Sequence, residues 1–424
     1  MRRLLPALLW AALFSPSSWA QPAMPVLASV AVTPLTLQQA QDAALARHPD
    51  LLAAQREVEA TEGGLIQAGV LPNPSLSAEW EDTRSATRTT TVLLAQPIEL
   101  GGKRSARRQA AERERDLALA EQKARRADVK AETTTAFFDV LIGQERQQLA
   151  DASLLLTQRG TQAVSNRVKA GKVSPIEETR ARLAESAVRM EQLKAHSELA
   201  SAQQRLASAM GAPLAITQKL DGQVTVLPAD IADSQFGPRW QQSPANLRAQ
   251  AAVGRAAAQV EVERARQTPD LTLSVGAKRD AETQRQVAVI GLSIPLPFLD
   301  TNRGAVLESL RRHDKARDEL AASELRMQTE VRLALEQLRT ARSEAKSLQD
   351  EVLPATQSAY DATAAGYELG KFGLLDVLDA QRSLLQARTQ YLQALSSAHR
   401  AATDVERLLG DPASAAPLNT TNNR

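Results

Sequence analysis

The sequence contains no cysteine and few aromatic residues, and both absences exclude classes of protein. Without cysteine there are no disulfides, no thiolate metal sites, no cysteine nucleophile and no acylated cysteine of a lipoprotein. Of the 424 residues only 13 are aromatic, whereas Ala, Leu, Gln, Glu and Arg dominate. Because this composition is typical of long helices, we expect narrow helix packing lined by alanine rather than a large compact globule.

Long hydrophobic runs are also scarce. Arg2 and Arg3 precede an apolar run at 4–14, and small residues up to Ala20 frame a cleavage site, which is the pattern of a secretory signal peptide. We therefore expect residues 1–20 to be removed on export. No later stretch reaches the roughly 18 apolar residues of a transmembrane helix, so the exported chain is predicted to be either soluble or a barrel.

Neither sign of charge is in excess. Removing the signal peptide takes two arginines and leaves 49 basic and 49 acidic residues, so net charge indicates no nucleic-acid partner. The four histidines are far apart and lack the spacing of a zinc site. No Gly-rich phosphate loop and no nucleophile elbow is found. We predict no cofactor, no metal site and no enzymatic activity.

The most informative feature that is present is an internal repeat at an offset of 195 to 199 residues. The matching pairs are Pro49 and Pro244, Pro74 and Pro269, Pro97 and Pro295, Arg104 and Arg303, Gly171 and Gly370, and Gly211 and Gly410. This series predicts two copies of one unit, at residues 35–211 and 239–410. Each copy reads as helix, hairpin, very long helix, glycine break and helix.

Alternating residues predict one β-hairpin in each copy. In the first copy Leu76, Ala78 and Trp80 alternate with polar residues, a polar turn follows, and a second strand returns. The hairpins are expected at about 75–96 and about 270–294. Their strands have roughly the 9 to 11 residues that a membrane barrel needs.

Two runs of helix-forming residues, with Pro354 as their one proline, predict very long helices at 104–170 and 303–369. Shorter helices are expected to follow at 174–210 and 374–409. A run of 67 residues would reach about 100 Å. The second run carries an apolar seam at strict 4-3 spacing, which demands a partner helix. The seam comprises Met327, Val331, Ala334, Leu338, Ala341, Ala345, Leu348, Val352, Ala355 and Ala359. The first run shows no equally clean seam.

The segments outside the repeat are predicted to be linkers. Residues 21–34 are Pro-rich, residues 212–238 join the two copies, and residues 411–424 form a polar tail that we expect to be disordered.

Two hairpins supply four strands, which cannot close a barrel whose every edge must be paired in lipid, so several chains must pool their strands. The run from Tyr367 to Ala380, YELGKFGLLDVLDA, resembles the periplasmic helix tip of the TolC family of outer-membrane efflux proteins. The resemblance covers roughly residues 35–410. Residues 97–104, PIELGGKR, and 71–74, LPNP, are most similar to the branch that serves heavy-metal exporters of the cobalt-zinc-cadmium type.

The resemblance implies a mainly α fold with a membrane β-barrel part, in which a homotrimer combines a long α-helical barrel with a 12-stranded β-barrel. It also implies a periplasmic adaptor, an inner-membrane RND pump and outer-membrane lipid as partners, in a Gram-negative cell. The expected function is a passive duct for divalent heavy-metal cations. Drug efflux or type I protein secretion is an alternative cargo. A non-conducting periplasmic coiled-coil scaffold is an alternative of another class, against which the two hairpins argue.

The resemblance assigns Asp376 and Asp379 to the pore constriction at the periplasmic mouth, where threefold symmetry would produce a ring of carboxylates. Without the resemblance, the favourable first turn of a helix is the better explanation of both acids. Glu177 is the equivalent of this site in the first copy, where it adds a third acidic ring or braces the tip. The family's gate arginine falls on Phe372, so its charged latch is expected to be absent.

Two further groups of residues follow from the resemblance. The helix tips expected to dock the adaptor comprise Gly171, Lys172, Val173, Ser174, Gly370, Lys371, Phe372 and Gly373. Lys103, Arg104 and Arg303 follow the hairpins at the start of the long helices, where cations oppose the helix dipole. Contacts with lipid phosphates would offset that cost, and a solvated basic turn is the alternative.

Overall fold

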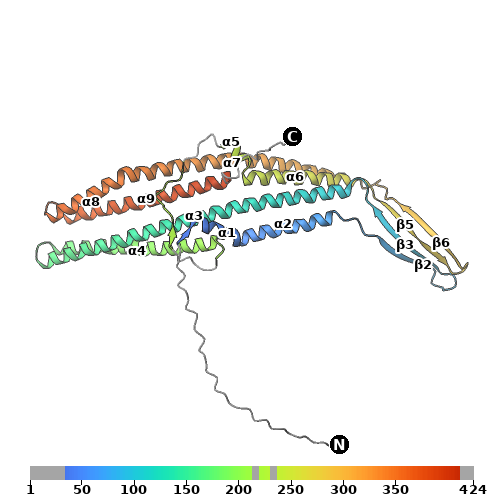
Figure 1. Ribbon diagram of the computed structural model, residues 1–424, viewed down its shortest axis with the longest axis horizontal. Coiled ribbons are helices and arrows are strands. Elements are labelled where there is room, and N and C mark those ends of the chain that lie inside the picture. The colour runs from blue at the N-terminus through green and yellow to red at the C-terminus, as the bar shows by residue number, and fades with distance from the viewer. Residues whose placement is uncertain (1–33, 213–218, 230–235, 411–424) are drawn as a thin grey trace, which may run out of the picture.

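The computed structural model describes residues 34–212, 219–229 and 236–410. The described part is a long, narrow body with helices over most of its length and a small sheet at one end (Figure 1). The predicted signal peptide, the 411–424 tail and most of the 21–34 linker lie outside the described residues, as do parts of the 212–238 linker.

Helices account for most of the chain and repeat in the same order in both halves. The first half contains α1 (Leu37–Arg47), α2 (Pro49–Ala68), α3 (Lys103–Lys169) and α4 (Pro175–Ala209). The second half contains α5 (Phe236–Gln241), α6 (Pro244–Ala265), α7 (Arg303–Ser347), a π-helical turn η2 (Leu348–Val352), α8 (Leu353–Glu368) and α9 (Leu374–Leu409). A short parallel pair joins β1 (Leu35–Thr36) to β4 (Leu220–Asp221).

Proline and glycine set the ends of these helices. Pro49, Pro175 and Pro244 each occupy the first turn of a helix, where the missing amide hydrogen costs nothing. Gly171 and Gly370 end helices in the left-handed conformation, with φ of 68° and 73°. The repeated prolines and glycines of the sequence are therefore the boundaries of equivalent elements.

The sheet contains four antiparallel strands in the order β2-β3-β5-β6. They are β2 (Ser75–Glu81), β3 (Thr89–Ile98), β5 (Leu271–Asp280) and β6 (Arg285–Ser293). The two hairpins therefore join through β3 and β5 into one sheet. Gly276 faces Leu93 at this junction, and a Cβ on it would lie 1.9 Å from the carbonyl oxygen of Val92. Close strand pairing thus requires glycine at this position.

One face of the sheet is apolar and exposed on the single chain. Its large exposed side chains are Leu76, Trp80, Val92, Leu94, Leu273, Val275, Ile290 and Leu292. The strand registers align these residues across neighbouring strands, while the other face carries mostly Ser, Thr, Gly and charged residues together with Leu93, Val287 and Val289. An outward apolar band of this kind is characteristic of membrane strands.

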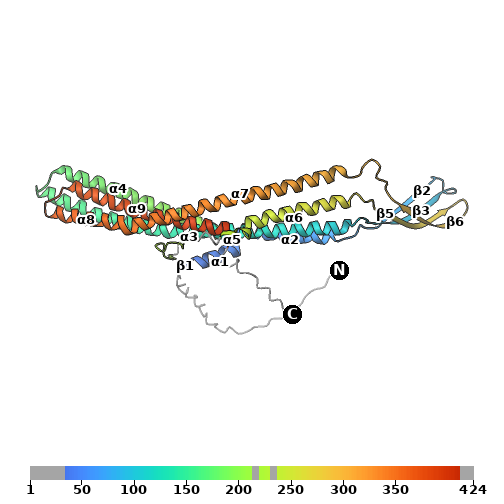
Figure 2. The ribbon, with the colours of Figure 1, turned by 90° about the horizontal axis from the view of Figure 1, so that it is seen from above.

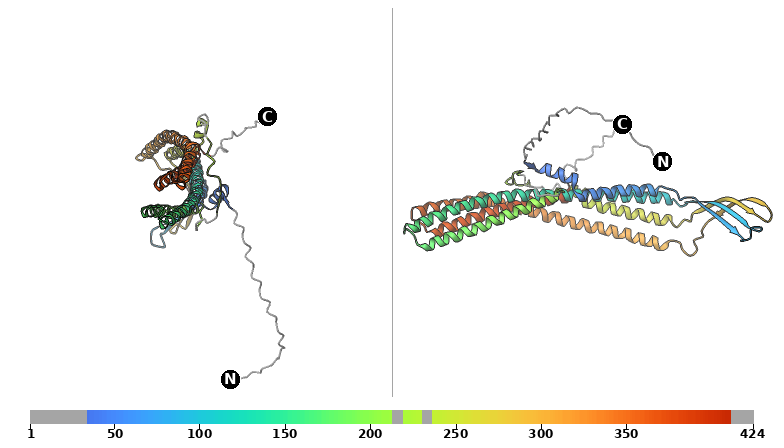
Figure 3. Two further views of the ribbon diagram at one scale, coloured as in Figure 1. Left: turned by 90° about the vertical axis from the view of Figure 1, so that its left-hand side faces the viewer. Right: turned by 90° about the horizontal axis from the view of Figure 1, so that it is seen from below.

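The helices form a single curved layer rather than a closed bundle (Figures 2 and 3). Near the sheet the order across the layer is α2, α3, α6 and α7, and at the far end it is α4, α3, α9 and α8. The end-on view in Figure 3 shows the crescent cross-section of this layer. One long edge therefore consists of α2 and α4, and the other consists of α7 and α8.

The main core lies where the two halves of the layer meet. Phe137, Val140, Leu206 and Leu395 from α3, α4 and α9 are fully or almost fully buried there. The mainly α fold with four strands and two internal repeats is confirmed.

The predicted seam of the second long helix is correct only up to the π-helical turn. From Met327 to Leu348 every seam position is buried, but Ala355 and Ala359 are exposed, while Thr356 and Tyr360 turn inward. A π-helical turn inserts one extra residue into the α-helical ladder, so the packing face moves by one position. The long helix predicted at 303–369 is one continuous helical run over 303–368 that contains this π-helical turn, and only the last two seam positions are wrong.

Candidate functional site

Two helix tips lie together at the end of the molecule farthest from the sheet (Figure 1). The first tip (residues 171–174) joins α3 to α4, and the second tip (residues 370–373) joins α8 to α9. Val164, Ala181 and Leu374 form a buried cluster between them. The structure thus brings the predicted tip residues of the two repeats to one end of the chain.

The first tip is a tight, hydrogen-bonded turn. Gly171 adopts a positive φ, which allows its amide and that of Lys172 to donate to carbonyls of the last turn of α3, both at 2.9 Å. Ser174 then caps α4 by accepting from the amide of Ile176 at 3.4 Å. Lys172 and Ser174 are exposed and Val173 is half-buried, so this tip presents polar side chains outward.

The second tip uses the same turn and adds an aromatic contact. The amide of Lys371 donates to the carbonyl of Gly366 at 2.8 Å. The Phe372 ring lies on Gly366, so closely that a Cβ on that glycine would be 2.2 Å from the ring. Phe372, which lies at the position of the family's gate arginine, therefore packs on α8. Gly373 is exposed and is the N-cap residue of α9.

Replacing Gly366 with alanine is expected to lower the free energy of opening of this turn by about 1–3 kcal/mol, because the added methyl group displaces the Phe372 ring. Hydrogen exchange at the Lys371 amide should become faster. Gly160→Ala is the matched control, since Gly160 lies within α3 with open space around its missing side chain. Unchanged exchange in the Gly366 variant would contradict the proposed contact.

The two predicted mouth acids differ in their local roles. Asp376 accepts a hydrogen bond from the amide of Gly373 at 2.8 Å, so it caps α9. Asp379, whose side chain is 70% exposed, has Arg382 at 3.4 Å as its partner. Both acids are exposed at the start of α9. Asp376 uses one carboxylate oxygen for the cap, so its second oxygen is available to solvent.

Glu177 lies between the two tips. It is half-buried, and one of its carboxylate oxygens is fully buried. Its neighbour Tyr367 has the guanidinium of Arg167 over its ring, 4.7 Å from the centroid. Burial raises the pKa of Tyr367, Arg167 lowers it, and the charge of Glu177 raises it. This placement favours the bracing role of Glu177 over a third acidic ring.

An exposed apolar stripe on α4 was not predicted. Its large members are Ile176, Leu183, Met190 and Leu193, of which Leu183 is 71% exposed. Together with the smaller residues Thr179, Ser186, Ser197 and Ala200, these positions follow a strict 3-4 spacing. The stripe lies on the side of α4 opposite its contact with α3. That spacing was the available signal in the sequence. Because such a repeat packs against a helix, this edge of the layer requires a partner.

The family model for outer membrane efflux proteins matches this chain twice, at residues 40–212 and 240–411. The two matches coincide with the two repeats of the fold. The chain belongs to the outer membrane efflux protein family.

Two relatives are similar to this chain in sequence, and one solved structure shares its fold. The cobalt-zinc-cadmium resistance protein CzcC of Cupriavidus metallidurans is 44% identical over 91% of this chain and 93% of its own length. The nickel-cobalt-cadmium resistance protein NccC of Alcaligenes xylosoxydans xylosoxydans is 28% identical over 68% of this chain and 65% of its own. The open outer membrane channel MtrE of Neisseria gonorrhoeae superposes with a TM-score of 0.74 at 21% identity, over 88% of each chain.

Membership of the outer membrane efflux protein family confirms the predicted location in the outer membrane, with the helical layer in the periplasm. The sheet is therefore the membrane part, and the tips point away from it into the periplasm. Proteins of this family are channels rather than enzymes. Among the helices that the structure describes, none is long and apolar enough to cross a membrane.

The basic residues predicted at the membrane interface of this family member have partners within the chain. Lys103 lies 2.7 Å from Asp270 and is mostly buried, and Arg104 donates to the carbonyl of Gly69 at 2.6 Å. Arg303 donates to the hydroxyl of Thr301 at 3.0 Å. These contacts tie the long helices to the hairpin connections. They also offset the unfavourable helix dipole in part, while contact with lipid phosphates stays a prediction.

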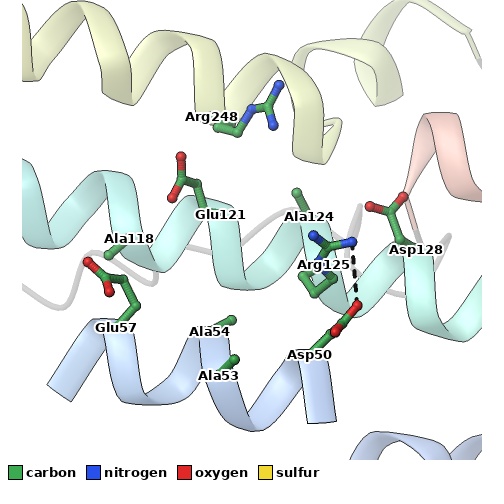
Figure 4. Close-up of a pocket in the computed structure, with 10 residues that line it drawn as sticks. All are labelled: Asp50, Ala53, Ala54, Glu57, Ala118, Glu121, Ala124, Arg125, Asp128 and Arg248. Carbon is green, nitrogen blue, oxygen red and sulfur yellow. Dashed lines mark ion pairs between the residues drawn. The ribbon is translucent and has the colours of Figure 1, made fainter. Parts of the chain in front are cut away.

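An open groove of about 500 Å³ lies between α2, α3 and α6 (Figure 4). Its charged lining consists of Asp50, Glu57, Glu121, Arg125, Asp128 and Arg248. Asp50 pairs with Arg125 at 3.8 Å, and Asp128 pairs with an arginine of α9 at 3.7 Å. Within residues 34–212, 219–229 and 236–410, no group of three or more His, Asp or Glu side chains is arranged so that it could hold a metal ion. We therefore assign no metal site to this groove.

Proposed function

We propose that three copies of this chain join edge to edge into a passive duct, which exports divalent heavy-metal cations across the periplasm and outer membrane. The observation that carries the proposal is the agreement between helix order and strand order. Helices α2, α3, α6 and α7 continue into strands β2, β3, β5 and β6 at the same positions across the layer. Sheet and helical layer therefore end in unpaired edges on the same two sides.

Closure of these edges by further copies is supported by the composition of the edges. The stripe on α4 has large apolar residues, whereas the exposed face of α8 is a small-residue stripe with similar spacing. The α8 stripe comprises Ala355, Ser358, Ala362 and Ala365. Large side chains on one edge fit small ones on the other, and strands β2 and β6 need partners in lipid. Members of this family act as trimers.

The partners follow from the position of the tips. Members of the family act with an adaptor and an inner-membrane pump, and both tips are exposed at the periplasmic end. We propose that residues 171–174 and 370–373 dock a periplasmic adaptor, which connects the duct to an RND pump. Asp376 and Asp379 then form the pore constriction, with Glu177 beside them, because threefold symmetry places the start of each α9 around one mouth.

The metal cargo is proposed from similarity to the relatives named for cobalt, zinc and cadmium resistance. Deleting the gene is expected to raise sensitivity to cobalt, zinc or cadmium several-fold, and more than sensitivity to hydrophobic antibiotics. The measurement is growth inhibition of the deletion strain beside a complemented strain. A greater loss of antibiotic resistance would favour drug efflux. A purified protein with no single-channel conductance in a planar bilayer would favour the periplasmic scaffold.

A further inference from the structure

The charged residues of the four strands are unevenly divided between the two faces of the sheet. By strand register, Glu79, Glu81, Lys278, Asp280 and Arg285 lie on the polar face. Arg279 lies on the apolar face, and it is the one charged strand residue there in the part of the chain described. Because a charge on a lipid-facing surface is costly, the position of this arginine requires a reason.

Arg279 belongs to a row that crosses the whole sheet. Trp80 faces Thr90, Thr90 faces Arg279, and Arg279 faces Gln286 across the strands. The adjacent row toward the helices contains small and apolar residues, namely Ala78, Val92, Ala277 and Ala288. The row of Trp80, Thr90, Arg279 and Gln286, which we call the rim row, therefore bounds the apolar face on the side away from the periplasm.

The depth of the rim row matches the boundary of a membrane. From Leu271 to Arg279 the strand rises about 27 Å, and a tilt of about 40° reduces this to roughly 20 Å along the membrane normal. The apolar band of outer-membrane barrels is about 25 Å tall. Since the helices occupy the periplasm, Arg279 lies near the outer boundary of this band, and its long side chain can extend to the headgroup region of the outer leaflet. The exposed Trp80 has the position of an interfacial aromatic residue.

The rim row is also free to bind a ligand. Arg279 is exposed and has no hydrogen-bond or ion-pair partner within residues 34–212, 219–229 and 236–410. Lys103 and Arg104, at the periplasmic end of the sheet, already have partners in the chain. On the apolar face, the unpaired basic residue of the described strands therefore lies at the outer end of the sheet.

We propose that the rim row binds a phosphate group of the outer-leaflet glycolipid. The guanidinium of Arg279 forms two parallel hydrogen bonds to one phosphate, which is a geometry that lysine cannot offer. The hydroxyl of Thr90 and the side-chain amide of Gln286 flank it as neutral donors. The proposal rests on the proposed trimer, because closure of the barrel turns the apolar face toward lipid.

The test measures binding of bisphosphorylated lipid A, and of the same lipid with its phosphates removed, to the purified trimer in detergent. Wild-type protein is expected to bind the bisphosphorylated lipid about tenfold more tightly than the dephosphorylated one. Arg279→Gln should lose that tenfold difference and Arg279→Lys part of it. Arg285→Gln is the matched control, since it removes an arginine from the polar face of the neighbouring strand.

Three results would overturn the proposal: equal binding of the two lipids by wild-type protein, an equal loss in Arg285→Gln, or equally tight binding of phosphatidylglycerol. The comparison of two lipids on wild-type protein needs no variant, so it decides the matter even if Arg279→Gln assembles poorly. Native mass spectrometry of the wild-type protein reports the trimer separately. A missing trimer contradicts the proposed function, whereas a trimer without phosphate preference contradicts the rim row alone.

Discussion

Replacing Leu183 with aspartate is expected to abolish trimer assembly and leave the helical content of the chain unchanged. Leu183 is 71% exposed on the single chain and lies in the middle of the stripe on α4. In the proposed trimer it packs against the alanines of α8 in the next copy. A carboxylate buried there without a partner costs on the order of several kcal/mol at each of the three interfaces. Light scattering and circular dichroism in detergent measure the two quantities.

Arg189→Asp is the matched control for this prediction. It introduces the same side chain into α4 at an exposed position that lies about 120° around the helix from Leu183. The control should form trimers in nearly wild-type yield. If Leu183→Asp also assembles normally, α4 is not at the interface and another edge must hold the copies together.

Replacing both Asp376 and Asp379 with asparagine is expected to reduce cation selectivity several-fold without preventing assembly. Asparagine at position 376 still accepts the amide hydrogen of Gly373 through its side-chain carbonyl, so the cap remains while the charge is lost. Around a threefold mouth the two substitutions remove six carboxylates from a region where counter-ions concentrate. Block by trivalent cations should weaken in parallel. Bilayer recordings of current reversal in a salt gradient measure the selectivity.

The capping role gives a different expectation for the same variant. If the two acids only stabilise the first turn of α9, their loss lowers stability by about 0.3–1 kcal/mol each and leaves selectivity unchanged. A melting curve measured beside the recordings separates these outcomes. Asp361→Asn is the control, because Asp361 is an exposed acid on α8 away from the start of α9.

The features that depend on residue type at a single position were predictable from the sequence. Gly171 and Gly370 occupy left-handed positions that favour glycine. Pro49 and Pro244 lie in the first turns of equivalent helices. The repeated residues therefore predicted where the helices begin and end. The strands were predictable because alternation reports which face a side chain occupies.

Features that depend on contacts between distant segments were not predictable. Lys103 meets Asp270 from the other repeat, a pairing that no local pattern indicates. The acid at position 376 satisfies both a capping pattern and a pore pattern, and sequence alone cannot separate them. The π-helical turn changes the packing face at Ala355 without any break in helix-forming composition, although Pro354 lacks the amide hydrogen needed for a regular ladder.

The π-helical turn also makes the two halves of each protomer mechanically unequal. Helix α3 is an unbroken rod from Lys103 to Lys169, whereas its counterpart is divided at Leu348–Val352 into two rods of 45 and 16 residues. Helices bend most readily where the ladder is irregular. We therefore expect a load applied at the tips to bend the second rod at this joint, and to displace the second tip more than the first.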